Sequence, residues 1–273
     1  MIAGQVSSRC SRPSALVLAA HGCGDASDAN ARVRLLARLL ASQEPGRQVV
    51  VAFELGSPTF RDALGELDLE RAGHRVQVVP IMAAAGFFTR QRLPEAFAAR
   101  AQALHVEVRI TTPLGSHAAV ILGAVARTAA RLRSLGPDVA AGHTAVLVAG
   151  HGTVRDSRSG ASTMSLVGEL RRSQPGLRVV GAFLDQEPRL ETVAAELSAR
   201  RLIVVPYLFG GGAHLQRDLG ARLDGSGPEV LIEPALSDAP ALPAALAAVT
   251  DLAVWREPRT VVAPMARWLR RVS

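Results

Sequence analysis

The chain has 273 residues, 48% of them hydrophobic, so it can bury two cores of ordinary domain size. All 31 basic residues are arginine and none is lysine, which excludes mechanisms that need a lysine, such as the Walker A loop and the Schiff base of pyridoxal phosphate. The formal net charge is +7, but the arginines are scattered and only 4% of the residues are aromatic. This pattern argues against nucleic acid and favours a polycarboxylate small molecule, although a GC-rich genome that encodes arginine in place of lysine would also explain any single surface arginine.

The hydrophobic residues do not form a membrane span, because no apolar run reaches the roughly 18 residues that a spanning helix needs. The two cysteines, Cys10 and Cys23, show no metal-binding spacing. So few cysteines in a chain of this length favour a reducing compartment. We therefore expect a cytoplasmic protein that has neither a membrane nor a nucleic-acid partner.

Short runs rich in valine and leucine predict strands that are covered on both faces. Helix-like stretches lie between them, such as the stripe of leucines at positions 35, 36, 39 and 40. Strand, helix and strand in this order imply right-handed crossovers and parallel sheets. The eight expected strands span residues 15–20, 48–53, 76–81, 106–111, 145–149, 178–183, 202–207 and 229–233.

The same series of motifs occurs in both halves of the chain. LVLAAHG (residues 16–22) returns as LVAGHG (147–152), VVVAF returns as VVGAF, and VVP is followed by a glycine-containing turn in each half. We therefore expect two copies of one fold. The predicted domains are an N-terminal repeat at residues 1–138, a C-terminal repeat at 139–254, and an extension at 255–273 to which we assign no role.

Polar side chains follow the first two strands of each copy. His21 and His151 come directly after the first strands, and Glu54 and Asp185 come after the second strands. In open parallel sheets, ligands bind beyond the carboxyl ends of the strands. Function is therefore expected where these edges of the two copies face each other.

Three strings of the second half carry a resemblance to a known family: HGTVRDSRSGAST (151–163), FLDQEPRLE (183–191) and VVPYLFGGGAHLQRDL (204–219). Together with their counterparts in the first half, they resemble the CbiX/SirB-type sirohydrochlorin chelatases, the class II tetrapyrrole chelatases, in the long two-repeat form. The resemblance implies two duplicated Rossmann-like α/β halves, each a mostly parallel four-stranded sheet flanked by helices, with the active cleft between them. It also implies ATP-independent insertion of Co²⁺ or Fe²⁺ into sirohydrochlorin or a related tetrapyrrole, in cobalamin or sirohaem biosynthesis.

Metal insertion requires ligands that hold the ion loosely and a group that accepts the two protons of the pyrrole nitrogens. Neutral imidazole suits the first task, and histidine or a carboxylate suits the second. The resemblance maps the metal pair onto His151 and His214, which we also expect to be the catalytic residues. The acid that completes the site remains open between Asp185 and Glu187.

The two copies differ where the second imidazole is expected. Aligning Gly86 with Gly212 places Phe88 opposite His214, so the first copy lacks the second histidine and its metal site is predicted to be degenerate. This copy would then form a wall of the pocket, with apolar surface for the macrocycle and arginines for its carboxylates. The expected substrate contacts are His21, Glu54, Phe87, Phe88, Arg90, Arg92, Arg155, Gly211 and Gly212. For His21, a purely structural role is equally compatible with the sequence.

Two alternatives belong to other functional classes. The same pocket could bind and deliver a metal or a tetrapyrrole without turnover. A histidine-nucleophile phosphotransferase is disfavoured, because such enzymes need an arginine just before the histidine, where Ala20 and Gly150 stand. The metal also stays open among Co²⁺, Fe²⁺ and Ni²⁺, since imidazole and carboxylate sites bind all three. We expect no ATP and no pyridoxal phosphate, and a monomer or weak dimer.

Overall fold

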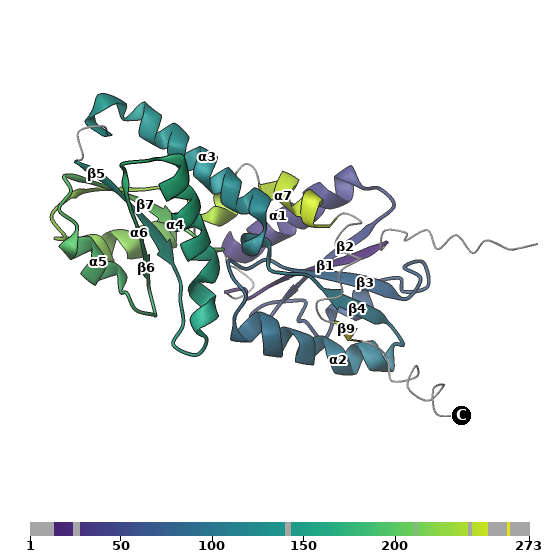
Figure 1. Ribbon diagram of the computed structural model, residues 1–273. Coiled ribbons are helices and arrows are strands. Elements are labelled where there is room, and N and C mark those ends of the chain that lie inside the picture. The colour runs from purple at the N-terminus through teal and green to yellow at the C-terminus, as the bar shows by residue number, and fades with distance from the viewer. Residues whose placement is uncertain are drawn as a thin grey trace, which may run out of the picture.

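The computed structural model describes residues 14–23, 28–139, 143–210, 212–239, 242–250 and 261–262 (Figure 1). Two α/β halves lie side by side, each built on a sheet whose four main strands are parallel. The strand order is β2-β1-β3-β4-β9 in the first sheet and β6-β5-β7-β8 in the second. The predicted fold class is therefore confirmed.

The main strands begin and end within two residues of the predicted positions. In the first sheet every residue of β1 is buried, and alternate side chains enter two separate cores on its two faces. The matching burial of β5 explains why both strands read as continuous apolar runs. The strands are β1 (Ala15–Ala20), β2 (Gln48–Phe53), β3 (Arg75–Pro80), β4 (Glu107–Ile110), β5 (Thr144–Gly150), β6 (Arg178–Phe183), β7 (Arg201–Pro206) and β8 (Glu229–Ile232).

One short strand was not expected from the duplication. β9 (Val261–Val262) pairs antiparallel with β4 and adds a fifth strand to the edge of the first sheet. It belongs to the extension at 255–273, of which the structure describes only these two residues. A two-residue strand carries no periodicity that sequence analysis could detect.

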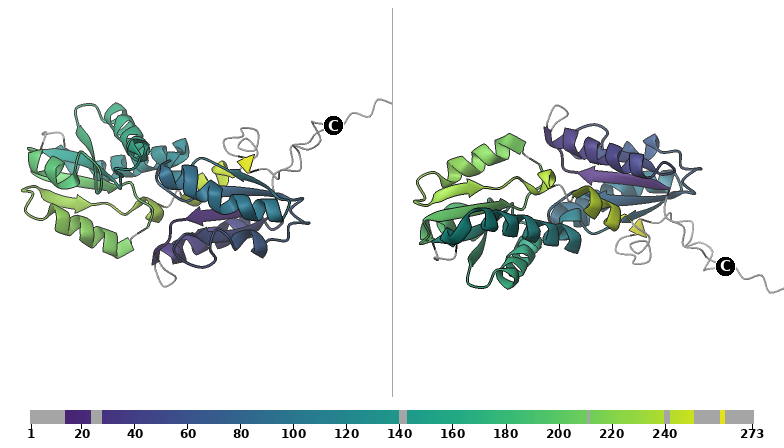
Figure 2. Two further views of the ribbon diagram at one scale, coloured as in Figure 1. Left: turned by 90° about the horizontal axis from the view of Figure 1, so that it is seen from below. Right: turned by 90° about the horizontal axis from the view of Figure 1, so that it is seen from above.

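Helices cover both faces of each sheet, and the last helix of each copy lies against the other copy. α3 follows β4 of the first sheet but packs against α4, and α7 follows β8 of the second sheet but packs against α1. Figure 2 shows the yellow α7 beside the N-terminal half. The helices are α1 (Asp28–Gln43), α2 (Leu93–Ala103), α3 (Ala118–Ser134), α4 (Ala161–Ser173), α5 (Leu190–Glu196), α6 (Gly212–Leu223) and α7 (Leu242–Val249).

This exchange of helices creates one core that both halves share. A single hydrophobic cluster contains Leu16 of β1, Val120 of α3, Val205 of β7 and Leu246 of α7, whereas α2 and α5 cover cores that belong to one half each. The hydroxyl of the buried Tyr207 donates to the carbonyl of Gly115 across the two copies. The two halves therefore pack as one molecule, and the domain boundary between residues 138 and 139 stays a prediction from the sequence.

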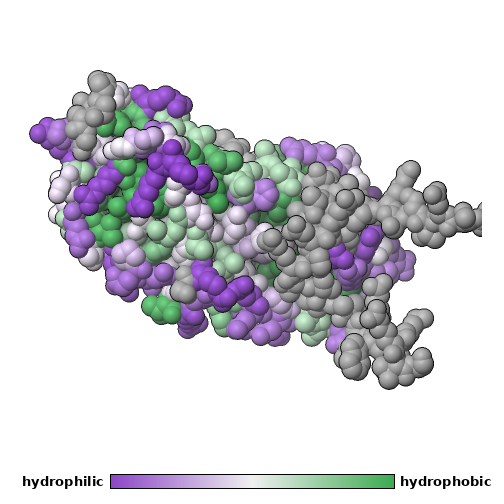
Figure 3. Space-filling model, in the orientation of Figure 1, coloured by the Kyte–Doolittle hydropathy of each residue, from purple (hydrophilic) through white to green (hydrophobic). Residues whose placement is uncertain are grey.

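On the face drawn in Figure 3, hydrophilic and hydrophobic residues are interspersed over the described part of the chain. None of the helices that the structure describes is long and apolar enough to cross a membrane.

Candidate functional site

The loop after the first strand has the same geometry in both copies. Gly22 and Gly152 have φ values of +75° and +68°, which favour glycine. A Cβ atom at Gly22 would lie 2.2 Å from the carbonyl oxygen of Leu55, and one at Gly152 would lie 2.6 Å from Cβ of Gln186. The HG motif therefore lets the loop after the first strand pack directly on the loop after the second.

Both histidines are oriented by their own loop. Nδ1 of His21 lies 3.0 Å from the carbonyl oxygen of Gly22, and Nδ1 of His151 lies 3.0 Å from that of Gly152. Because a carbonyl oxygen only accepts, each contact is a hydrogen bond when Nδ1 carries the proton. The lone pair is then on Nε2, which leaves this atom of each exposed ring ready to bind a cation.

Asp185 is the acidic residue that contacts His151. Its Oδ2 lies 3.3 Å from Nδ1 of His151, with both side chains more than half exposed. Glu187 instead faces Arg189, with its carboxylate 3.0 Å from the backbone nitrogen and 3.6 Å from Nε of that residue. Of the two acids left open by the sequence, the structure therefore brings Asp185 to the histidine.

The counterpart of Asp185 in the first copy is Leu55, not Glu54. The backbone nitrogen of Asp185 donates to the carbonyl of His151 at 2.9 Å, and that of Leu55 donates to the carbonyl of His21 at 2.8 Å. The nitrogen of Glu54 bonds one residue earlier, to Ala20, at 3.2 Å. The ungapped alignment of AFEL (52–55) with AFLD (182–185) gives the same pairing, with Glu54 opposite Leu184.

Other groups occupy the surroundings of His21. The ring centroids of His21 and Phe88 are 5.2 Å apart, and Phe88 in turn packs against Phe60 at 5.8 Å. Nη2 of Arg92 lies 2.6 Å from Oε1 of Glu54. The pKa of Arg92 is raised, mainly by this hydrogen bond and to a smaller extent by the negative charge of Glu54. At this edge Phe88 lies beside His21, Leu55 stands at the position of Asp185, and Glu54 is engaged with Arg92.

In each copy one amide side chain bonds to the backbone of the loop after the first strand, and the sequence analysis did not identify either of them. Oδ1 of Asn30 accepts from the backbone nitrogen of Cys23 at 3.2 Å, and its Nδ2 donates to the carbonyl of Leu55 at 3.3 Å. In the second copy Oε1 of Gln186 accepts from the backbone nitrogen of Thr153 at 3.2 Å. The amide comes from α1 in one copy and from the loop after β6 in the other, so no shared motif reveals it.

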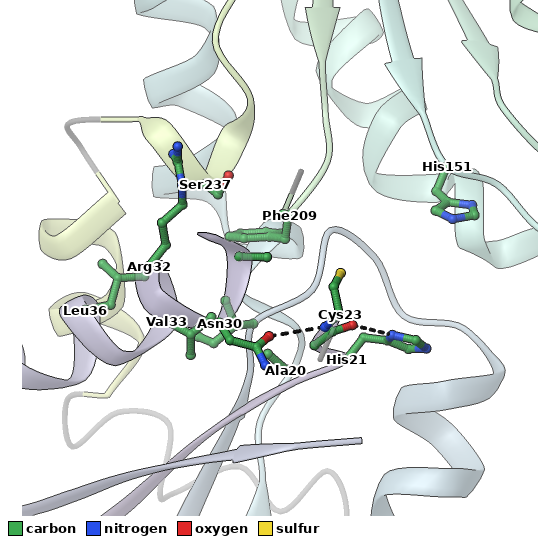
Figure 4. A pocket seen from close by; sticks show the side chains of 14 residues that line it. Ala20, His21, Cys23, Asn30, Arg32, Val33, Leu36, His151, Phe209 and Ser237 are labelled. Atoms are coloured by element: carbon green, nitrogen blue, oxygen red, sulfur yellow. Dashed lines mark hydrogen bonds between the residues drawn. The ribbon is translucent and has the colours of Figure 1, made fainter. Parts of the chain in front are cut away.

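His21 and His151 line one pocket from opposite halves (Figure 4). The cavity has a volume of about 310 Å³, and Phe209 contributes an aromatic face to it. Cys23 also lines the pocket, and its side chain is exposed. A pocket that both copies line, as expected from the sequence, is therefore present around the two histidines.

The other predicted substrate contacts divide between two further cavities. A cavity of about 320 Å³ is lined by Phe87 and Arg90 of the first half and by Arg155 of the second. Another, of about 380 Å³, lies within the first half and includes Glu54 and Arg92. Arg90 and Arg155 are therefore placed between the halves, whereas Arg92 is held away from them by Glu54.

The second predicted metal ligand lies partly outside the described residues. Gly211 is not among the described residues. Gly212 and His214 belong to α6, but only their backbone is described. β5 and β7 are neighbours in the sheet, with Ala149 opposite Pro206, so His151 and α6 follow adjacent strands at the same edge. Among the described side chains, no three histidine, cysteine or acidic groups are arranged to hold a metal, and His214 is not among them.

Comparisons with known proteins agree on one family. The family model CbiX matches residues 15–130 and 145–251. A protein from Halobacterium salinarum, described as a probable sirohydrochlorin cobaltochelatase, is 25% identical over 195 residues, which make up 63% of each chain. The match therefore spans less than two thirds of that relative.

Solved structures share the fold at low sequence identity. SirB from Bacillus subtilis with Fe³⁺ has a TM-score of 0.69 and 18% identity, with 93% of this chain and 97% of that chain covered. The structure described as CbiX, the terminal enzyme for biosynthesis of siroheme in denitrifying bacteria, has a TM-score of 0.67 and 24% identity, with 86% and 96% covered. A multi-domain protein from Deinococcus radiodurans has a TM-score of 0.66 and 20% identity, and here the match covers 94% of this chain but 60% of the other.

Proposed function

Because the chain belongs to the CbiX family of sirohydrochlorin chelatases, we propose that it inserts a divalent metal into sirohydrochlorin or a related tetrapyrrole. The metal is a substrate, Co²⁺ or Fe²⁺, with Ni²⁺ as a further candidate. The reaction uses neither ATP nor pyridoxal phosphate and serves cobalamin or sirohaem biosynthesis. The chain acts in the cytoplasm as a monomer or weak dimer, with a tetrapyrrole as its only partner.

The observation that carries this proposal is the contact of Asp185 with His151, the histidine of the second half that lines the pocket between the halves. With Nδ1 directed at Gly152 and Asp185, the lone pair of His151 is on Nε2. His214, at the start of α6 on the neighbouring strand, is the proposed second ligand. Two imidazoles hold the ion loosely enough to release it to the macrocycle.

Asp185 serves the same site in two ways. Its carboxylate orients the ring of His151, as the partners of metal-bound histidines commonly do. It is also an exposed acceptor for the protons that the two pyrrole nitrogens lose when the metal binds. We therefore assign the acidic role to Asp185 and not to Glu187, which faces Arg189.

Exposed apolar residues in the loops beyond the strand ends suit a flat, partly apolar ligand. Leu55, Phe87 and Val154 are exposed large hydrophobic residues, and they lie in the loops after β2, β3 and β5. Val154 is 86% exposed, three residues after His151. Exposed apolar residues at a ligand-binding edge indicate a binding surface, and the face of a macrocycle would cover them.

The test is a single-turnover absorbance assay of metal-free sirohydrochlorin with Co²⁺, Fe²⁺ or Ni²⁺, with the rate without protein subtracted. The wild-type chain should accelerate insertion, and His151→Ala should lower the rate by at least a hundredfold, since it removes a metal ligand. His143→Ala is the matched control, because His143 is exposed and precedes β5 at the opposite edge of the sheet. Binding of tetrapyrrole or metal without acceleration would identify a carrier instead.

A further inference from the structure

One cavity is lined by both halves and contains arginines from each. It has a volume of about 320 Å³ and is lined by Phe87, Arg90 and Gln91 after β3 and by Arg155, Asp156 and Arg158 after β5. The two segments approach closely beside it, since a Cβ atom at Gly86 would lie 3.7 Å from Cβ of Ser159. A ligand group in this cavity therefore contacts both halves at once.

The charge of the cavity is positive and only partly compensated. Asp156 is its one acidic residue, and both of its carboxylate oxygens bind Arg158, at 2.9 Å to Nε and 3.1 Å to Nη2. The side chain of Asp156 is only 8% exposed, and Oδ1 also accepts from the backbone nitrogen of Arg158. This carboxylate is thus fully engaged with one arginine.

Arg90 and Arg155 are the two remaining cations of the cavity. Both are exposed, and within the described part of the chain neither guanidinium has a carboxylate partner. A guanidinium keeps its charge at any physiological pH and binds a carboxylate through two parallel hydrogen bonds. Two such groups, one from each half, fit a ligand that carries several carboxylates along one edge.

The position of Arg155 connects this cavity to the proposed metal site. It lies four residues after His151 in the same loop, and its backbone nitrogen donates to Oγ1 of Thr153 at 3.2 Å. Gln186 in turn holds the backbone of Thr153, so Arg155 extends from a loop that is anchored beside Asp185. Phe87, on the opposite side of the cavity, supplies apolar surface next to Arg90.

We propose that Arg90 and Arg155 form a two-sided carboxylate clamp, which binds peripheral carboxylates of the tetrapyrrole from both halves and selects macrocycles with many carboxylates. The identity of the ligand rests on the proposed function, whereas the geometry of the clamp does not. Each arginine acts from its own half, so a ligand bound by both holds the two halves together. A macrocycle with carboxylates on every pyrrole offers one to each arm in any orientation, whereas a macrocycle with only two offers them in few orientations.

The test measures equilibrium binding of metal-free porphyrins by fluorescence quenching, without any metal or turnover. One probe carries eight peripheral carboxylates and the other carries two. Arg90→Gln and Arg155→Gln should each weaken binding of the octacarboxylate about tenfold, and the double variant should weaken it further, while binding of the dicarboxylate changes little. Arg178→Gln, an exposed arginine at the start of β6, is the matched control and should leave both affinities unchanged.

Ionic strength provides a second measurement on the same proteins. Added salt should weaken octacarboxylate binding by the wild type more than by the double variant, because the clamp acts through charge. Unchanged octacarboxylate affinity in both single variants, equal losses for the two porphyrins, or no binding of either porphyrin by the wild type would overturn the clamp. If the wild type fails to insert metal but still prefers the octacarboxylate through these arginines, the proposed activity is rejected and the clamp stands.

Discussion

Replacing Asp185 by asparagine separates a functional from a structural role of its contact with His151. The two side chains are 56% and 67% exposed, and exposed ion pairs contribute only about 0 to 1 kcal/mol to folding. Asp185→Asn should therefore change the free energy of unfolding by less than about 0.5 kcal/mol. The same substitution removes the carboxylate that orients a metal-binding imidazole, and losses of that kind lower activity about 10- to 100-fold.

The assay pairs urea unfolding with single-turnover insertion on the same preparations. Glu187→Gln is the matched control, because it neutralises an acid two residues away that faces Arg189, and it should keep wild-type insertion. The reasoning fails if Asp185→Asn destabilises the chain by more than about 1 kcal/mol while insertion is unaffected, since the pair would then be structural. It also fails if Glu187→Gln is the variant that loses insertion.

Three further substitutions test the remaining parts of the argument. His21→Ala should raise the KM for sirohydrochlorin with little loss of kcat, whereas His151→Ala abolishes turnover, and steady-state kinetics showing the reverse would move the metal site to the first copy. Gly152→Ala should lower the free energy of unfolding in chemical denaturation by about 1 to 3 kcal/mol, because Gly152 has a positive φ and an added Cβ atom would lie 2.6 Å from Cβ of Gln186. Gly168→Ala in α4 is the control and should not destabilise the chain, because no atom lies within 4 Å of its Cβ position. Tyr207→Phe should cost about 1 to 2 kcal/mol through the lost bond to Gly115. Because burial raises the pKa of Tyr207, the tyrosine ionises first in the unfolded chain, so the stability of the wild type, but not of Tyr207→Phe, should fall through this ionisation as pH rises above about 10. Tyrosinate absorbance should then appear only on unfolding.

The sequence by itself determined the duplication and the edge of each sheet where the strand-end histidines lie. Strands such as β1 and β5 are buried on both faces, so their apolar runs could be recognised without tertiary information. The parallel order follows from the alternation of strands and helices, and it places His21 and His151 at carboxyl ends of the sheets. The replacement of a histidine by Phe88 was also visible, because the glycine turns after β3 and β7 align without gaps.

Only the tertiary structure decided which side chains meet. It showed that the backbone nitrogens of Leu55 and Asp185 both bond to the carbonyl of the histidine that follows the first strand, which sets the register of the two loops. It also paired Arg92 with Glu54 while leaving Arg90 in a cavity with Arg155. The exchange of α3 and α7 between the halves was equally hidden, since an amphipathic helix shows that it must be covered but not by which sheet. Local periodicity fixes the elements, whereas contacts between distant segments depend on how those elements pack in three dimensions.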